Sequence, residues 1–354
     1  MGNVYQKGMK RLSKHKHAIT LLFLIIVLFI TMVVAVSIGP ITIPFQQTVF
    51  IFLDKLNINT SGFFVDQHSI VITDIRLPRV IVAALVGCSL AISGVAMQGL
   101  FRNPLVEPGF IGISSGAAFG AVLAIFFGLT SIHQAMLPML AFLGALLAMA
   151  IILAVWRVTK SNSVAMLLLL GIGINAFFSS LTNVLIASSS TEQELRGALM
   201  WLQGGLEGTT WEHVKVIAPI VIIGSIIISF FGRSLNLMLL GDEQAHSSGV
   251  NLKLVRNMLL TIVALITAAA VAVSGIISFV GLVVPHMLRL VIGADHRLLL
   301  PASMVTGAIF LILTDLISRM ILQPVTLQIG VVSAMIGAPI FILLILRSSR
   351  RMHL

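Results

Sequence analysis

Residues 76–117 read RLPRVIVAALVGCSLAISGVAMQGLFRNPLVEPGFIGISSGA, and this stretch decides the fold. It is apolar from Val80 to Val95 and then breaks into a polar segment rich in proline and glycine, residues 102–109. Hydrocarbon tolerates a helix but not broken backbone facing lipid, because each unpaired N–H or C=O group there costs several kcal/mol. We therefore expect the break at a membrane surface, inside protein, or along a water-filled path.

Composition places the whole chain in a bilayer. Hydrophobic residues make up 58% of the 354 residues and charged residues only 10%, which is more apolar surface than a soluble domain of this size can bury. Cys88 is the only cysteine, so an intrachain disulfide and a metal site built from several thiolates are both excluded. We predict an all-α polytopic membrane protein that forms a single domain over residues 1–354.

Ten apolar spans follow from the hydropathy pattern. The first, residues 18–38, suits a retained transmembrane helix better than a signal peptide, because it is about 20 residues long and lacks a cleavage site. Residues 39–75 are expected to form a polar loop. The other spans fall at about 77–99, 109–129, 134–155, 163–187, 212–232, 255–274, 276–292, 299–321 and 327–346. Merging the two weakest, 109–129 and 276–292, with their neighbours would leave the orientation unchanged.

Basic residues set the orientation. If both termini are cytoplasmic, all but six of the 22 lysines and arginines fall on the inner side, as the positive-inside rule requires. The six on the outer side are Lys55, Arg76, Arg79, Arg196, Lys215 and Arg319. The net charge of +10 is thus explained by membrane topology, and no nucleic-acid partner is needed.

One sequence pattern recurs in the second half. Ala91-Ile92-Ser93-Gly94 is echoed by Ala272-Val273-Ser274-Gly275, and both copies are followed by Gly-Leu and then proline. The two copies cross the predicted membrane in opposite directions, which indicates inverted repeats over about 75–190 and 255–350. Interrupted helices at matched positions in inverted halves point to a transport path. Chance remains the alternative, since such pairs are common where membrane helices pack closely.

The longest cytoplasmic connection, residues 233–256, predicts two short amphipathic helices joined at Gly241. Such a surface can dock a partner through an apolar ridge. Periodicity alone does not distinguish this docking element from a plain interfacial connector.

Four segments together resemble the permease subunits of ABC importers for iron–siderophores, haem or cobalamin, the FecCD type. They are residues 76–79 (RLPR), 94–117 (including GLFRNPL, EPG and GISSGA), 281–286 (GLVVPH) and 329–339 (IGVV to GAP). They span almost the whole chain in family order. The resemblance implies the type II ABC importer permease fold with ten transmembrane helices per subunit, and a location in the cell membrane of a bacterium.

The resemblance also implies the partners. A second permease subunit, in a homodimer or a close heterodimer, would form the translocation path at the interface, with cytoplasmic ATP-binding subunits and an extracytoplasmic substrate-binding protein. No cofactor is implied. The chain contains no Gly-x-x-x-x-Gly-Lys-[Ser/Thr] phosphate loop, so ATP hydrolysis must belong to a partner and the chain is not itself an enzyme.

Site residues are implied at both membrane surfaces. At the outer side, Arg76, Arg79 and Arg319 match positions that accept carboxylates of the binding protein, for which forked guanidinium donors are well suited. The alternatives are snorkelling at the membrane edge and, for Arg319, an i,i+4 ion pair with Asp315. At the inner side, the resemblance assigns ATPase coupling to loop 233–254, in particular to Gly241, Asp242, Glu243, Ala245 and Gly249. Ser161, Asn162 and Ser163 match the inner gate, or form an ordinary tight turn.

Other functional classes fit less well. An ion-driven secondary transporter also predicts broken helices, but it needs a buried ionisable site near mid-membrane, and the chain offers almost none. A membrane enzyme needs clustered histidines or carboxylates. We expect an import permease for an iron chelate, siderophore or haem, with cobalamin as the alternative cargo.

Overall fold

The computed structural model describes residues 2–58, 62–159 and 164–352, and every regular element in these ranges is a helix. Seven helical segments in these ranges are long and apolar enough to cross a membrane. They fall in the helices α1 (Gly2–Ser37, of which His17–Ser37 is the span), α4 (Leu77–Phe101, extended by the helical turns before it), α6 (Met136–Thr159), α7 (Val164–Ala187), α9 (Trp211–Phe230), α12 (Leu252–Ser274) and α14 (His296–Met320). The all-α prediction is confirmed.

Three shorter apolar helices occupy the remaining predicted spans: α5 (Ile113–Phe126), α13 (Val280–Ile292) and α15 (Ile329–Met352). Each of the ten predicted spans thus coincides with a helix. The count of ten full crossings is approximate, because α5 and α13 are shorter than the hydrocarbon thickness requires.

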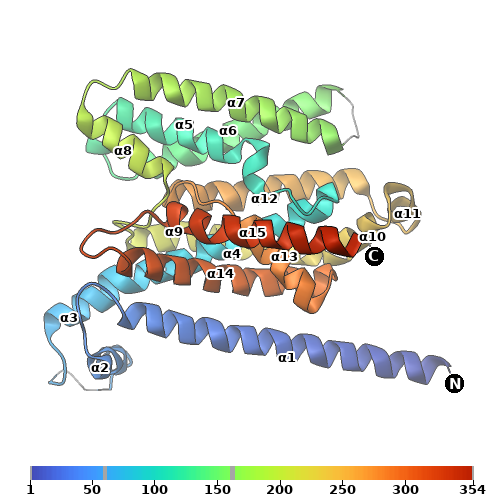
Figure 1. The fold of residues 1–354 in the computed structure, drawn as a ribbon, viewed down its shortest axis with the longest axis horizontal. Helices are drawn as coiled ribbons and strands as arrows, with labels where there is room; N and C mark the ends of the chain where they lie inside the picture. The colour runs from blue at the N-terminus through green and yellow to red at the C-terminus, as the bar shows by residue number, and fades with distance from the viewer. Residues whose placement is uncertain (1, 59–61, 160–163, 353–354) are drawn as a thin grey trace.

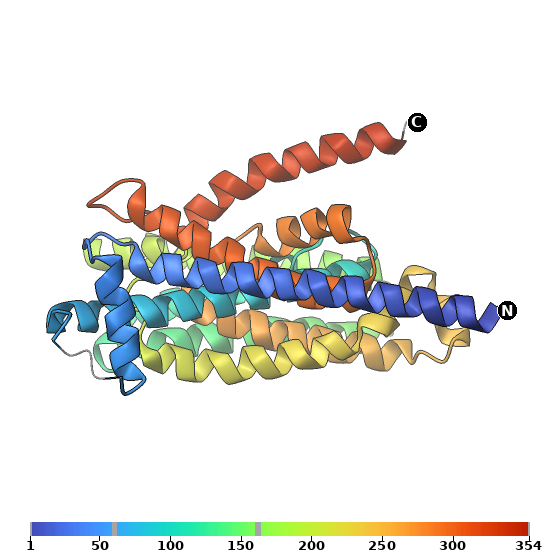
Figure 2. The same ribbon diagram turned by 90° about the horizontal axis from the view of Figure 1, so that it is seen from below.

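Helix α4 forms the centre of the bundle (Figure 1). Of the most apolar window in the segment that contains it, 78% is buried inside the protein, compared with 17% for α1. It packs against α9, α12, α13 and α14, whereas α1 lies along the outside of the bundle against α14 (Figures 1 and 2). The stretch 76–117 is therefore the structural core, and α1 offers most of its surface to lipid.

Glycines in α4 allow its neighbours to approach at backbone distance. A Cβ atom added at Gly94 would lie 1.9 Å from the carbonyl oxygen of Gly281 on α13, and one at Gly87 would lie 2.2 Å from that of Gly307 on α14. Real Cβ atoms do not approach oxygen so closely. Small residues at membrane helix interfaces serve this purpose, so the glycines of α4 set how closely α13 and α14 approach it.

The break after α4 is only partly covered by protein, because Val106 and Pro108 are buried whereas Arg102, Pro104 and Leu105 are exposed. Helix α4 ends where Arg102 adopts a left-handed conformation (φ 49°). A 3₁₀ turn, Pro108–Ile111, then leads into α5. From α7, Asn175 donates through Nδ2 to the carbonyl oxygen of Phe110 (3.1 Å), and its Oδ1 accepts from Ser115 Oγ (2.7 Å). Polar side chains thus complete the hydrogen bonding of irregular backbone that would be costly in lipid.

The second copy of the repeated pattern differs locally from the first. Ser93-Gly94 lies within continuous α4, whereas Ser274-Gly275 lies where α12 ends, with Gly275 at φ 66°. The matched positions are therefore not interrupted in the same way. The inverted repeat of the two halves stays a prediction.

The bundle has two ends, which we call the outer and the inner end after the predicted orientation. One end, left in Figure 1, carries α2 (Phe45–Lys55), α3 (Asp66–Ile70) and α8 (Glu192–Leu202). The other end carries both termini, α10 (Gly232–Leu239) and α11 (Asp242–Ser247). The expectation of a polar loop over 39–75 is wrong, because α2, α3 and a π-helix, Val71–Arg76, occupy most of it. Apolar residues of α2, including buried Ile51, pack on the bundle and stabilise this helix.

Candidate functional site

Arg76 at the outer end is buried and binds the end of another helix. Its Nη1 donates to the carbonyl oxygens of Val36 (3.0 Å) and Ser37 (2.8 Å), and its Nη2 donates to that of Ile41. The last carbonyls of a helix have no partner within the helix and carry its negative dipole end. The guanidinium of Arg76 donates hydrogen bonds to these carbonyls and brings a positive charge to the negative end of the helix dipole. Arg76 therefore joins the start of α4 to the end of α1.

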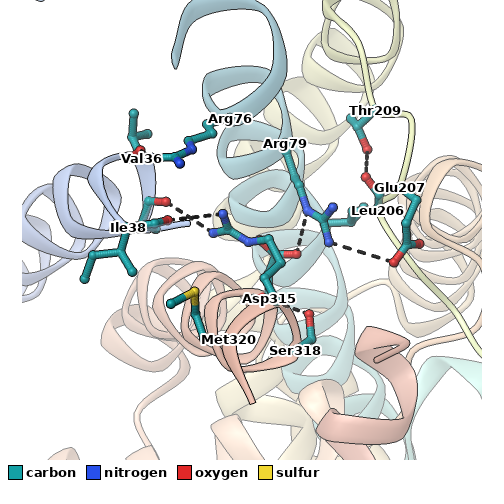
Figure 3. A network of polar contacts seen from close by, with 12 residues as sticks. Val36, Ile38, Arg76, Arg79, Leu206, Glu207, Thr209, Asp315, Ser318 and Met320 are labelled. Carbon is teal, nitrogen blue, oxygen red and sulfur yellow. Dashed lines mark hydrogen bonds and ion pairs between the residues drawn. The ribbon is translucent and has the colours of Figure 1, made fainter. Parts of the chain in front are cut away.

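Asp315 on α14 contacts the other two predicted docking arginines, Arg319 and Arg79; the contact with Arg79 is drawn in Figure 3. Its Oδ1 accepts a hydrogen bond from Nε of Arg79 at 2.9 Å, and its Oδ2 lies 3.0 Å from Nε of Arg319. The second contact is ionic without hydrogen-bond alignment. Arg319 also donates to the carbonyl oxygens of Ala35 (3.2 Å) and Ile38 (3.3 Å). The i,i+4 pair considered from sequence is present, and it is buried.

These internal contacts leave little of the three arginines accessible for the predicted docking of a binding protein. Arg76 and Arg319 are each only 4% exposed. Arg79 reaches further, and its Nη2 lies 4.0 Å from Oε1 of Glu207, whose side chain is 38% exposed (Figure 3). In this conformation the three guanidinium groups bind the protein itself, and docking of a binding protein by them stays a prediction. Neither the contact of Glu207 with Arg79 nor the bridge from Arg79 to Asp315 is predictable from a local pattern, because the partners are distant along the chain.

A cavity of about 970 Å³ lies at the same end of the molecule. It is bounded by α8, the beginning of α6, the connection before α9 and the end of α12. Its polar lining includes Gln134, Glu194, Glu207, His213 and Gln328. A space of this size accommodates a bulky organic ligand, and Glu207 joins it to the arginine cluster.

The inner end carries the predicted helical hairpin. Helices α10 and α11 are joined at Gly241, as expected from the sequence. Gly241 (φ 122°) and Gly249 (φ 85°) flank α11 in conformations that favour glycine, and both have open space where a Cβ would lie. Ala245 is fully buried and Glu243 is exposed. We call residues 232–249 the coupling hairpin; its role in ATPase coupling stays a prediction.

Asp242 is an ion-pair partner that the sequence could not assign. Its Oδ1 pairs with Arg102, and its Oδ2 lies 2.7 Å from Nη2 of Arg256. Burial alone would raise the pKa of Asp242, but the hydrogen bond and charge of Arg256, with those of Arg102, outweigh it and hold the pKa below its ordinary value. Asp242 is therefore ionised at neutral pH.

Ser161, Asn162 and Ser163 lie outside the described residues, so their assignment to the inner gate stays a prediction. In the part of the chain that the structure describes, no group of three or more histidine, cysteine or acidic side chains could hold a metal ion.

Comparison with known proteins identifies the family. The model of the FecCD transport family matches residues 24–347. The hemin transport system permease protein HmuU of Yersinia pestis is 43% identical over 277 residues, covering 77% of this chain and 82% of HmuU. The cobalamin import system permease protein BtuC of Halobacterium salinarum is 41% identical over 281 residues, covering 79% of this chain and 74% of that protein.

The fold also matches a solved structure. A metal-chelate type ABC transporter in an inward-facing conformation superposes with a TM-score of 0.81 and 33% identity, covering 92% of this chain and 98% of the other. The chain belongs to the FecCD transport family, as a multi-pass membrane permease subunit of ABC importers that pairs with separate ATPase subunits and a second permease subunit.

Proposed function

We propose that this permease imports an iron chelate, siderophore or haem, delivered by an external binding protein. The observation that carries the proposal is the outer cavity of about 970 Å³, which is far larger than a simple ion needs. Its lining mixes polar side chains with Trp201 and Met200, a surface that suits an amphipathic chelate. Two relatives are named for the transport of hemin and of cobalamin, both of which are bulky organic metal complexes.

Two copies of the chain would wall the translocation path between them. Figure 2 shows α15 diverging from the bundle towards its C-terminal end. Large apolar side chains on this helix are exposed, among them Met335 (63%) and Leu343 (61%). A second copy would cover this face and close the path laterally. Cysteine placed at Met335, in a Cys88→Ser background, is expected to cross-link two copies in the membrane; a pure population of uncross-linked chains would contradict the homodimer.

Docking of the binding protein is proposed at the outer arginine cluster. Arg79 is the most accessible of the three arginines, and Glu207 already occupies its outward side at 4.0 Å. A carboxylate of the binding protein would compete with Glu207 for the same guanidinium. Arg76 and Arg319 would contribute positive potential from behind, since both are held in fixed positions.

The coupling hairpin is proposed to contact the ATPase subunit at the inner side. Exposed Glu243 and the open flanks of Gly241 and Gly249 face away from the packed core. Closure of the ATPase dimer would displace α11 and the helices attached to it. Gating by Ser161, Asn162 and Ser163 at the α6–α7 connection completes the proposed cycle.

Reconstituted transport tests the proposal. The permease, its ATPase subunit and its binding protein are incorporated into proteoliposomes and supplied with haem, a ferric hydroxamate siderophore or cyanocobalamin. We expect ATP-dependent accumulation of an iron chelate and none with a non-hydrolysable ATP analogue. Accumulation of cyanocobalamin alone would assign the alternative cargo. Accumulation driven by an ion gradient without the ATPase would overturn the function.

A further inference from the structure

The coupling hairpin is held to the permease core by two polar side chains, one on each of its helices. Asp242 is the first residue of α11, and Asn236 lies in α10. Together they bind residues at the inner ends of three long helices, α4, α12 and α14.

The Asp242 contacts reach two of these helices. Arg102 directly follows α4, and its guanidinium pairs with Oδ1. Arg256 lies near the beginning of α12, is 4% exposed, and its Nη2 lies 2.7 Å from Oδ2. Hydrogen bonds between ionised partners are about twice as strong as neutral ones. One carboxylate thus links the hairpin, α4 and α12.

The Asn236 contacts reach the third helix. Its Nδ2 donates to Oδ1 of Asp295 at 2.6 Å, and its Oδ1 accepts from the backbone N–H of His296 at 2.9 Å. Asp295 is the N-cap of α14 and also accepts from the N–H of Arg297 at 3.0 Å. The side chain of Asn236 therefore replaces an intrahelical partner at the beginning of α14.

Apart from these ion pairs, helix α11 buries little side-chain surface against the core. Its only buried side chain is Ala245, a single methyl group. It is bounded by Gly241 and Gly249, both with positive φ, a conformation that favours glycine. Residues 248–251 join α11 to α12 through the chain, and the ion pairs of Asp242 add a side-chain link from α11 to both α4 and α12.

We propose that Asp242 is a positioning residue that transmits the movement of the coupling hairpin to α4 and α12, while Asn236 transmits it to α14. The inference rests on the proposed contact between the hairpin and the ATPase subunit. The two neighbouring acids then have different tasks: Glu243 faces the partner, and Asp242 faces the permease core.

The test uses the complete transporter in nanodiscs, with an environment-sensitive fluorophore on a cysteine introduced at Leu105, which is 43% exposed shortly after α4. Cys88 is replaced by serine. The fluorophore reports movement of the inner end of α4 on addition of ATP, without any cargo. Co-purification of the ATPase subunit reports assembly, and phosphate release reports hydrolysis.

In Asp242→Asn we expect normal assembly and continued ATP hydrolysis, but a fluorescence response reduced about tenfold, a typical size for coupling between sites. Asp242→Glu keeps the charge and is expected to restore the response. Arg102→Gln should reproduce the defect. The double variant Arg102→Gln/Asp242→Asn should be little worse than either single change, because the two residues act through one contact.

Matched variants separate this inference from the proposed function. Glu243→Gln should weaken assembly with the ATPase, whereas Glu212→Gln removes an exposed outer pair with Lys215 (2.7 Å) and should change nothing. A full fluorescence response in Asp242→Asn and Arg102→Gln, with normal assembly, would overturn the inference alone. Loss of assembly in Asp242→Asn would also overturn it, by making Asp242 a partner contact. Failure of a cysteine at Ser248 to cross-link to the ATPase in the otherwise unchanged protein would overturn the proposed contact itself.

Discussion

The carboxylate of Asp315 has no exposed surface, yet it faces two guanidinium groups. A buried charge is tolerated because its partners are fixed, and removing one member leaves the others uncompensated. At this position a single carboxylate holds α4 to α14 at the outer end. Arg79 and Arg319 would repel each other without it.

Asp315→Asn is therefore expected to lower the free energy of unfolding by about 3–5 kcal/mol, the usual cost of breaking a buried pair. Denaturant titration of the purified protein in detergent measures the change. Asp66→Asn, at an exposed position of α3, serves as the control. Equal stability of Asp315→Asn and the wild type would show that the arginines find other partners.

Asp242 predicts a pH dependence with a definite sign. Its folded-state pKa lies below the ordinary value of 3.8, with the guanidinium groups outweighing burial. A lowered folded pKa gives stability that is present above the unfolded pKa and is lost as pH falls through the folded one. The stability difference between wild type and Asp242→Asn should be constant from about pH 8 to pH 5 and shrink below about pH 4. Denaturant titrations of both proteins across this range measure it; a difference that fades near neutral pH would contradict the assignment.

The close packing of α4 against α13 depends on glycines, because a larger residue does not fit at the contact. Gly94→Ala would place a methyl group against the carbonyl oxygen of Gly281, so α4 and α13 must separate. We expect a loss of about 1–3 kcal/mol in unfolding free energy, as for overpacked cores. Gly173→Ala is the matched control on α7, where nothing lies within 4 Å, and should gain up to about 1 kcal/mol from helix propensity. Equal effects of the two changes would contradict the close packing.

Local patterns explain which elements could be predicted from the sequence. The coupling hairpin followed from Gly241 between two amphipathic runs, and the Arg319–Asp315 pair followed from helical spacing. The bridge from Arg79 to Asp315 joins residues 236 apart in sequence, so no local pattern indicates it. Helices α2 and α8 do not follow from the hydropathy pattern, because each is only 11 residues long and mixes polar with apolar residues.

The distribution of charge over the whole molecule predicts its orientation. The coupling hairpin and both termini lie at one end, and α2, α3 and α8 at the other (Figure 1). In intact cells carrying Cys88→Ser, a cysteine at exposed Ser190 should react with a membrane-impermeant maleimide. A cysteine at exposed Ser248 should react only after permeabilisation. The reverse pattern would place the coupling hairpin outside the cell, where it could not contact the cytoplasmic ATPase subunit.

The two buried arginines hold α1 through its backbone atoms, whereas its side chains contribute apolar packing. Arg76 and Arg319 bind the carbonyl oxygens of Ala35, Val36, Ser37, Ile38 and Ile41, which every amino acid supplies. Substitutions at lipid-exposed positions of α1 that keep it helical and apolar are therefore expected to leave these contacts intact. The two arginines recognise the exposed carbonyl groups at the end of a helix and not a particular sequence.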